Sequence, residues 1–169
     1  MMQRLLLCAA VTALSTLAQG AELVGKVVAI ADGDTITLLD AYSRQHKVRL
    51  QGIDAPERGQ AYWKASKQHL ADGVYLRQVV VEYDKKDRYG RIVGHVRHEG
   101  RDMNLEQLQA GAAWFYRKYA KELSADVRAN YAVAEIAASR DRRGLWREEQ
   151  PVAPWDWRAR GRAMQQKGN

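Results

Sequence analysis

Residues 23–39 have the sequence LVGKVVAIADGDTITLL, in which two runs rich in branched apolar residues flank an Asp-Gly pair. Such runs are typical of half-buried β-strands. An Asp-Gly pair between them is a strong signal for a tight hairpin turn, because both residues tolerate the positive φ that the turn needs. We therefore predict strands over residues 23–31 and 34–39, joined by a turn at Asp32 and Gly33.

The rest of the chain adds three strand patterns and three helical ones. Short alternations of apolar and polar residues predict further strands over residues 46–51, 74–83 and 91–97. A weak helical period indicates a first helix over residues 60–71, and Asn104 can cap a second helix that ends at Gly111. A third helix is expected over residues 124–139. Strands therefore dominate the first half of the chain, and helices dominate the second.

The composition is that of a single globular domain with an excess of positive charge. The chain has 169 residues, of which 46% are hydrophobic and 28% are charged. This balance supports a packed core and excludes a disordered chain or a membrane protein with several spans. The 27 Lys and Arg residues exceed the 20 Asp and Glu residues, which gives a net charge of +7. Polyanions, either nucleic acid or an anionic membrane surface, are the natural partners.

The N-terminal residues have the pattern of a secretory signal peptide. Arg4 precedes the apolar run of residues 5–17, which is too short to span a bilayer as a helix, and Ala18 and Gly20 fit a signal-peptidase site. We expect cleavage after Gly20, with an uncleaved membrane anchor as the alternative. Cleavage would remove Cys8, the one cysteine, and leave 26 basic and 20 acidic residues, a net charge of +6. The exported protein would then hold no disulfide.

The expected organisation is a signal peptide over residues 1–20, a folded domain over residues 21–148 and a basic C-terminal tail over residues 149–169. The tail interleaves tryptophans with arginines: Trp155, Trp157, Arg158, Arg160 and Arg162. Such side chains can stack on bases and pair with phosphates, but tryptophans next to prolines commonly hold a terminus against its domain. Both interpretations stay open. We expect a monomer in the periplasm or the medium, without stable membrane association.

Three short segments carry groups suited to chemistry. In the first, Asp34 follows the Asp-Gly turn, where its carboxylate can point into a cleft or serve only the turn. In the second, Arg49 lies on the polar side of its strand, just before Asp54 and Glu57. These two acids also fit a helix-capping box, but capping leaves Arg49 unexplained. In the third, Arg91 opens a strand after a turn that by itself is a solvated hairpin tip.

Together these segments supply the groups needed for phosphodiester hydrolysis. Two carboxylates can bind a hard cation, a third can act as a base, and two guanidiniums can grip a phosphate. The segments are Asp-Gly-Asp-Thr at residues 32–35, Arg-(x4)-Asp-x-Pro-Glu at residues 49–57 and Asp-x-Tyr-Gly-Arg at residues 87–91. In this ordered set, over residues 24–146, the chain resembles the staphylococcal nuclease, or thermonuclease, family.

The resemblance implies a fold and an activity. The fold would be α+β, mainly a five-stranded OB-fold barrel with three α-helices. The activity would be that of a calcium-dependent endonuclease that hydrolyses DNA and RNA with low sequence specificity and leaves 3′-phosphate ends. Asp34 and Asp54 correspond to the family's calcium carboxylates, and the main-chain carbonyl of Ala55 to a further calcium ligand. Ala55 stands where Thr is common, which matters little if only the carbonyl binds.

The resemblance also implies catalytic and substrate-binding residues. Glu57 would orient or deprotonate the attacking water, and Arg49 and Arg91 would neutralise the phosphate. The residues expected to bind single-stranded or locally opened DNA and RNA are Arg88, Tyr89 and Tyr119. The main alternative is a catalytically silent OB-fold protein that only binds nucleic acid, and the full set of acids and arginines argues against it. A calcium-stabilised interaction module would have no need of the two catalytic arginines.

Overall fold

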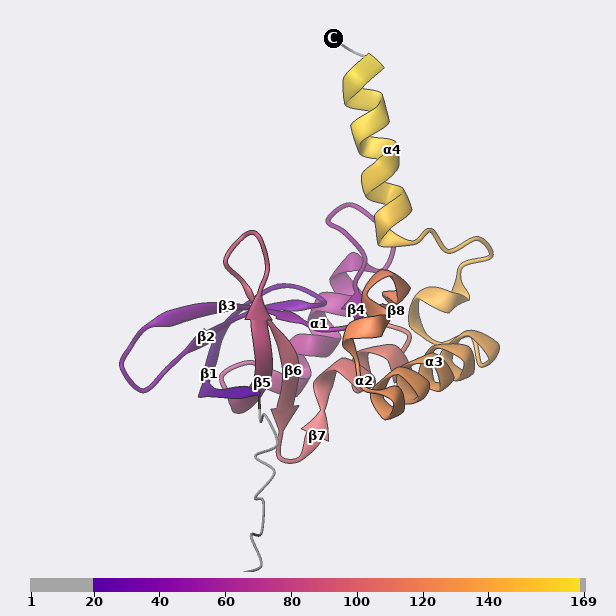
Figure 1. The fold of residues 1–169 in the computed structure, drawn as a ribbon. Helices are drawn as coiled ribbons and strands as arrows, with labels where there is room; N and C mark the ends of the chain where they lie inside the picture. Colours follow the sequence, from indigo (N-terminus) through magenta and orange to yellow (C-terminus); the bar gives the residue numbers. More distant parts are fainter. Residues whose placement is uncertain (1–19, 168–169) are drawn as a thin grey trace, which may run out of the picture.

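Five strands form a closed barrel in the structure, a computed structural model that describes residues 20–167 (Figure 1). The strands are β1 (Ala21–Asp32), β2 (Thr35–Leu39), β3 (Gln45–Leu50), β5 (Gln78–Lys86) and β6 (Ile92–His98). They follow the order β3-β2-β1-β5-β6 through antiparallel pairs, and a parallel pairing of β3 with β6 closes the barrel. The expected α+β class and the five-stranded OB-type barrel are confirmed.

The first strand begins directly after the expected cleavage site. Strand β1 starts at Ala21, whose backbone pairs with Tyr83 on β5. The predicted signal peptide, apart from Gly20, lies outside the described residues and stays a prediction. In the part of the chain that the structure describes, no helix has both the length and the apolar character needed to span a bilayer.

The β1–β2 hairpin follows the sequence pattern. Strand β1 ends at Asp32, β2 begins at Thr35, and these two residues pair across the turn. Because side chains alternate along a strand, one face of the hairpin is apolar, and its residues Val27, Ile36 and Leu38 are fully buried. The hairpin therefore builds much of the barrel interior and leaves its polar turn at one end.

Within residues 20–167, four α-helices and several short elements accompany the barrel. The α-helices are α1 (Trp63–Val74), α2 (Met103–Gln109), α3 (Ala125–Arg140) and α4 (Pro154–Lys167). The short elements are strands β4 (Ile53–Asp54), β7 (Arg101–Asp102) and β8 (Trp114–Phe115), and 3₁₀ helices η1 (Arg117–Glu122) and η2 (Gly144–Arg147). The first three α-helices correspond to the three expected ones. The fourth helix, α4, was not among the three expected helices, and it lies within the expected tail.

Helix α1 lies later in the chain than expected. It begins at Trp63, after Tyr62 in a left-handed conformation with a φ of 61°, and it continues to Val74. Leu70 and Val74 lie one helical turn apart, and both are buried, so this extra turn adds apolar contact. Strand β5 consequently begins at Gln78 and not at residue 74.

Asn104 is not the helix cap that we expected. Helix α2 is capped by Asp102, whose side chain accepts a hydrogen bond from the Leu105 amide at 3.0 Å. Asn104 is fully buried; its side-chain amide donates to the Gln51 carbonyl at 2.9 Å, and its oxygen accepts from the Val96 amide at 3.0 Å. Buried polar groups need such partners. Asn104 therefore ties α2 to β6 and to the residue that follows β3.

Helix α4 extends away from the rest of the molecule in Figure 1, and its first turn meets an aromatic cluster. The Trp155 ring stacks on Tyr116, with 5.4 Å between centroids, and meets Trp114 edge-on at 5.7 Å. Trp114 also contacts Trp146 at 4.4 Å. Trp157, by contrast, is exposed. Trp155 therefore anchors the helix, as one of the two interpretations of the tail proposed.

Candidate active site

The turn between β1 and β2 directs the Asp34 side chain into the protein. Gly33 packs so closely against α1 that a Cβ atom here would lie 1.7 Å from Oγ of Ser66, so a side chain cannot fit. The Gln107 side chain on α2 donates to the Gly33 carbonyl at 2.6 Å. These contacts fix the turn, and Asp34 is only 2% exposed.

Two buried carboxylates meet at the guanidinium of Arg49. Strands β2 and β3 pair with Thr35 opposite Arg49, which places the arginine next to Asp34. Nη1 of Arg49 donates to Oδ1 of Asp34, and Nη2 donates to Oδ1 of Asp54 at 2.8 Å. Oδ2 of Asp34 accepts from the Ala55 amide at 2.7 Å. The structure thus brings together four residues that the sequence indicated, Asp34, Arg49, Asp54 and Ala55.

Asp54 lies on a strand and does not cap a helix. Strand β4 pairs with β8, with Asp54 opposite Trp114. Strand β8 is held in turn by Glu135 of α3, which accepts from the Phe115 amide at 2.8 Å. The helix that follows Asp54 begins only at Trp63. Backbone pairing therefore holds this carboxylate, which is 1% exposed.

Glu57 is joined to Asp54 by Arg158, a residue of α4. Nη2 of Arg158 donates to Oδ2 of Asp54 at 2.6 Å, and Nη1 donates to Oδ1 of Asp54 at 3.2 Å and to Oε1 of Glu57. The loop around Glu57 is closed by its own amide, which donates to the Gln60 side chain at 2.9 Å. The contact of Arg158 with Asp54 and Glu57 was not predicted from the sequence, in which the arginine-rich composition of the tail was the available signal.

Burial and charge give the carboxylates of the site different acidities. Burial alone would raise the pKa of Asp34, but the charge of Arg49 and a backbone hydrogen bond outweigh it and lower that pKa. At Asp54, burial dominates and raises the pKa, although the contact with Arg158 opposes it. Burial and the charge of Asp34 raise the pKa of Asp32 to about 7. Of these three carboxylates, Asp34 therefore has the strongest tendency to stay ionised.

Arg91 lies next to β3 but pairs with a different acid. Arg91 directly precedes β6, whose first residue, Ile92, pairs with Val48 of β3. Its Nε and Nη2 atoms bind Oδ2 of Asp87 at 2.8 and 2.7 Å. The Tyr89 ring, 68% exposed, lies 4.8 Å from the guanidinium carbon of Arg88 and 5.6 Å from that of Arg91. The β5–β6 turn therefore holds three predicted residues, Arg88, Tyr89 and Arg91. Its Arg91 pairs with Asp87 and not with the carboxylates around Arg49.

Tyr119, the remaining predicted substrate residue, lies on η1. Its ring meets Tyr116 edge-on at 5.2 Å. The ammonium nitrogens of Lys118 and Lys85 lie 5.7 and 5.9 Å from its ring centre. Through Lys85 the tyrosine contacts β5, and through Tyr116 it adjoins the aromatic cluster that anchors α4. Tyr119 is therefore a half-exposed ring between basic side chains.

The oxygen atoms of the cluster suit a hard divalent cation. Carboxylate and carbonyl oxygens, such as those of Asp34, Asp54 and Ala55, are the ligands that calcium prefers. Both carboxylates already converge on a positive group, the guanidinium of Arg49. Among residues 20–167, no three His, Cys, Asp or Glu side chains form a group that could hold a metal. A bound calcium ion would therefore take several of its ligands from water or substrate.

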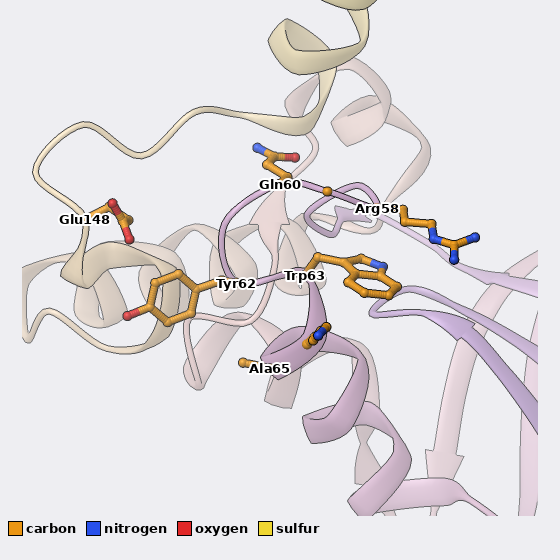
Figure 2. A pocket seen from close by; sticks show the side chains of 8 residues that line it. Arg58, Gln60, Tyr62, Trp63, Ala65 and Glu148 are labelled. Carbon is orange, nitrogen blue, oxygen red and sulfur yellow. The ribbon is translucent and has the colours of Figure 1, made fainter.

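A separate pocket of about 630 Å³ adjoins the loop after Glu57. Its lining includes Arg58, Tyr62 and Trp63 from the start of α1 and the preceding loop, together with Glu148. Figure 2 shows Arg58 next to Trp63, with 5.9 Å from the guanidinium carbon to the ring centre, and Tyr62 extending toward Glu148. The carboxylates of the cluster do not line this pocket. The groups suited to hydrolysis therefore lie outside it.

Comparison with known proteins gives one consistent result. The family model described as staphylococcal nuclease homologue matches residues 47–148, which include Arg49, Asp54, Glu57 and Arg91. An uncharacterized endonuclease of Escherichia coli is 39% identical over 141 residues, covering 83% of this chain and 88% of that protein. A micrococcal nuclease of Shigella flexneri is 39% identical over 160 residues, covering 89% of this chain and 88% of that protein. The staphylococcal-like nuclease CAN1 of Arabidopsis thaliana is 34% identical over 119 residues, which cover 70% of this chain and 35% of that protein.

Proposed function

The chain belongs to the staphylococcal nuclease family and is an endonuclease of that type, and we propose that it depends on calcium, cleaves DNA and RNA with low sequence specificity and leaves 3′-phosphate ends. The observation that carries this proposal is the convergence of Asp34 and Asp54 on Arg49. Glu57 adjoins the same cluster through Arg158. Two acids for a cation, an arginine for the phosphate and a third acid for the water match the needs of phosphodiester hydrolysis.

Asp34, Asp54 and the carbonyl of Ala55 would hold the calcium ion. When bound, calcium would supply positive charge to a phosphate oxygen and to a water molecule. Both carboxylates are buried, and backbone contacts at Ala55 and in the β4–β8 pair place Asp34 and Asp54. A site with two carboxylates favours weak affinity, in the range of about 10⁻⁴ to 10⁻³ M that is typical of extracellular modules. This range supports activity outside the cell.

Arg49 and Arg91 would face the charge that develops on the phosphate. Arg49 is preorganised, because two carboxylates fix its guanidinium and its side chain is 19% exposed. Arg91 is held by Asp87 and would share its guanidinium between that acid and the phosphate. A planar guanidinium can donate two parallel hydrogen bonds to a phosphate, which an ammonium group cannot do.

Glu57 would accept the proton of the attacking water. Its side chain is 37% exposed, so a water molecule can reach the carboxylate. As the water oxygen bonds to phosphorus, its proton passes to Glu57, and the bond from phosphorus to the 5′-oxygen breaks. The 5′-oxygen leaves as a hydroxyl with a proton from solvent, and the phosphate stays on the 3′-oxygen. Cleavage of this bond leaves the proposed 3′-phosphate ends.

The β5–β6 turn and η1 would hold single-stranded or locally opened nucleic acid. Tyr89 and Tyr119 are 68% and 43% exposed, and each ring has a basic side chain close to it. Exposed rings can stack on any base, and cations beside them can pair with phosphates. The net charge of +6 that signal cleavage would leave adds a general attraction for polyanions. Such contacts support binding with little dependence on sequence.

Export is also part of the proposal. Signal cleavage after Gly20 would leave a monomeric protein in the periplasm or the medium. Strand β1 pairs from Ala21 onward, so cleavage at this bond would leave the barrel intact. N-terminal sequencing of the protein from an exported fraction should give Ala21 as the first residue. Cytosolic protein with an intact Met1 would contradict the proposal.

Plasmid cleavage by the purified protein tests the activity. We expect cleavage with calcium and none with a chelator, and products whose 3′ ends need a phosphatase before a polymerase can extend them. Asp54→Asn should weaken calcium binding by roughly tenfold or more and lower activity in step, because the site loses one of its two charged ligands. Asp72→Asn, which changes an exposed acid on α1, is the matched control. Binding of DNA without cleavage would instead identify a silent nucleic-acid-binding protein.

A further inference from the structure

Arg158 occupies the oxygen atoms of Asp54 that the proposed calcium site needs. Oδ2 of Asp54 accepts from Arg158 at 2.6 Å, and Oδ1 accepts from Arg158 at 3.2 Å and from Arg49 at 2.8 Å. Arg158 also donates to Oε1 of Glu57. Because guanidiniums engage both oxygens, a metal ion can bind the Asp54 carboxylate only if it displaces one of these contacts.

The two arginines are held with different firmness. Arg49 lies on a barrel strand, donates to Asp34, Asp54 and a backbone carbonyl, and is 19% exposed. Arg158 lies on a helix that extends from the body, and it is 33% exposed. Removal of Arg49 would leave Asp34 as an uncompensated buried charge, which is costly. Arg158 can turn into solvent, so it is the guanidinium that a metal ion would displace.

We propose that Arg158 is an internal cation that competes with a divalent metal ion for Asp54 and Glu57, so that docking of α4 and metal binding oppose each other. This inference rests on the calcium site of the proposed function. Coupling between two binding events is reciprocal. The docked helix therefore weakens metal binding by the same factor by which bound metal weakens docking of the helix.

Two variants can release the helix contact in different ways. Arg158→Ala removes the competing charge itself. Trp155→Ala removes the stacking on Tyr116 and Trp114 that anchors the same helix, and it leaves every charge of the site in place. Arg160 lies on α4 and is exposed, so Arg160→Ala makes the same change of charge away from the carboxylates and serves as the matched control.

Calorimetric titration of calcium into the purified protein and these variants tests the proposal. Calcium should bind about tenfold more tightly to Arg158→Ala, more tightly also to Trp155→Ala, and with unchanged affinity to Arg160→Ala. Equal affinities in all four proteins would overturn the competition and leave the proposed function standing. Absence of calcium binding in all four would overturn the competition together with the calcium site. Trp155→Ala keeps the test decisive if Arg158→Ala does not fold.

Amide hydrogen exchange gives a readout that does not depend on activity. In the unaltered protein, calcium should speed exchange over residues 156–167, because the ion would release the first turns of α4. In Arg158→Ala, exchange over the same residues should be fast already and should change little with calcium. Exchange of the unaltered α4 that is insensitive to saturating calcium would overturn the proposal.

Discussion

Two arginines from different regions of the molecule neutralise the same carboxylate, that of Asp54. Arg49 comes from β3, a strand with hydrogen-bonded neighbours on both sides in the closed barrel. Arg158 comes from α4, which extends from the body of the molecule (Figure 1) and whose first turn is anchored by the contacts of Trp155 with Tyr116 and Trp114. The backbone therefore fixes the first contact, whereas a small set of side chains maintains the second. The comparison teaches that the barrel supplies one half of the ion pairing of Asp54 and that a docked helix adds the other half, in competition with a metal ion.

Among the substitutions that test the difference between the barrel and α4, replacement of Arg49 should have the largest effect. Arg49→Lys keeps the charge but loses the planar pair of donors, so we expect kcat to fall by roughly 10²- to 10³-fold. Steady-state cleavage of a labelled oligonucleotide at saturating calcium measures this. Arg44→Lys, at an exposed side chain on the β2–β3 turn, is the control and should retain full activity. Near-normal kcat in Arg49→Lys would remove the role assigned to its guanidinium.

The free energy of unfolding should depend more on the barrel core than on α4. Leu38 is fully buried in the barrel, so Leu38→Ala should lower the free energy of unfolding by about 2–5 kcal/mol. Trp155→Ala should loosen α4 and lower the stability of the barrel by less than about 1 kcal/mol. Urea denaturation followed by far-UV circular dichroism measures both values. Equal losses of stability in the two variants would show that α4 is an integral part of the barrel's folding unit. That result would contradict the difference between the barrel and the docked helix.

A smaller, pH-dependent effect is expected at Asp40, a carboxylate neutralised within its own β2–β3 turn. Its hydrogen bond with His46 and those from Arg44 and the Tyr42 amide hold its pKa below the usual range. A lowered pKa stabilises the fold above the ordinary Asp pKa of about 3.9, and this contribution is lost as the pH falls below that value.

Asp40→Asn tests this linkage through the melting temperature. At pH 7 the variant should melt about 2 °C below the unaltered protein, because the charge-assisted contacts are gone. Below about pH 3 the two melting temperatures should approach each other, because the Asp40 carboxyl is then protonated in the unfolded chain and, at still lower pH, in the folded protein as well. A difference that stays constant from pH 7 to pH 2 would show that the charge of Asp40 contributes nothing.

The barrel half of the site was predictable because its determinants are local in the sequence. An Asp-Gly turn sets the place of Asp34, and strand alternation sets the polar orientation of Arg49, five residues before Asp54. The choice between a helix cap and a site residue for Asp54 needed the structure. It depended on the two-residue pairing of β4 with β8, which is too short to leave a sequence period.

The helix half was not predictable, because it depends on contacts between distant segments. Arg158 is 104 residues from Asp54, and no local pattern specifies this partner. Asn104 was misassigned for the same reason. It matches the composition of a helix cap, but its side chain instead joins α2 to β6 and to Gln51 across the interior.

The most direct test of the central claim, that hydrolysis takes place at this cluster with Glu57 as the base, is single-turnover cleavage by Glu57→Gln. At saturating calcium and enzyme, the cleavage rate should fall by roughly 10²- to 10⁴-fold, because an amide cannot take a proton from water. The affinity for the oligonucleotide, measured in the same mixtures, should change little, and the exposed control Glu149→Gln should match the unaltered protein. A Glu57→Gln variant that cleaves at the unaltered rate would contradict the account.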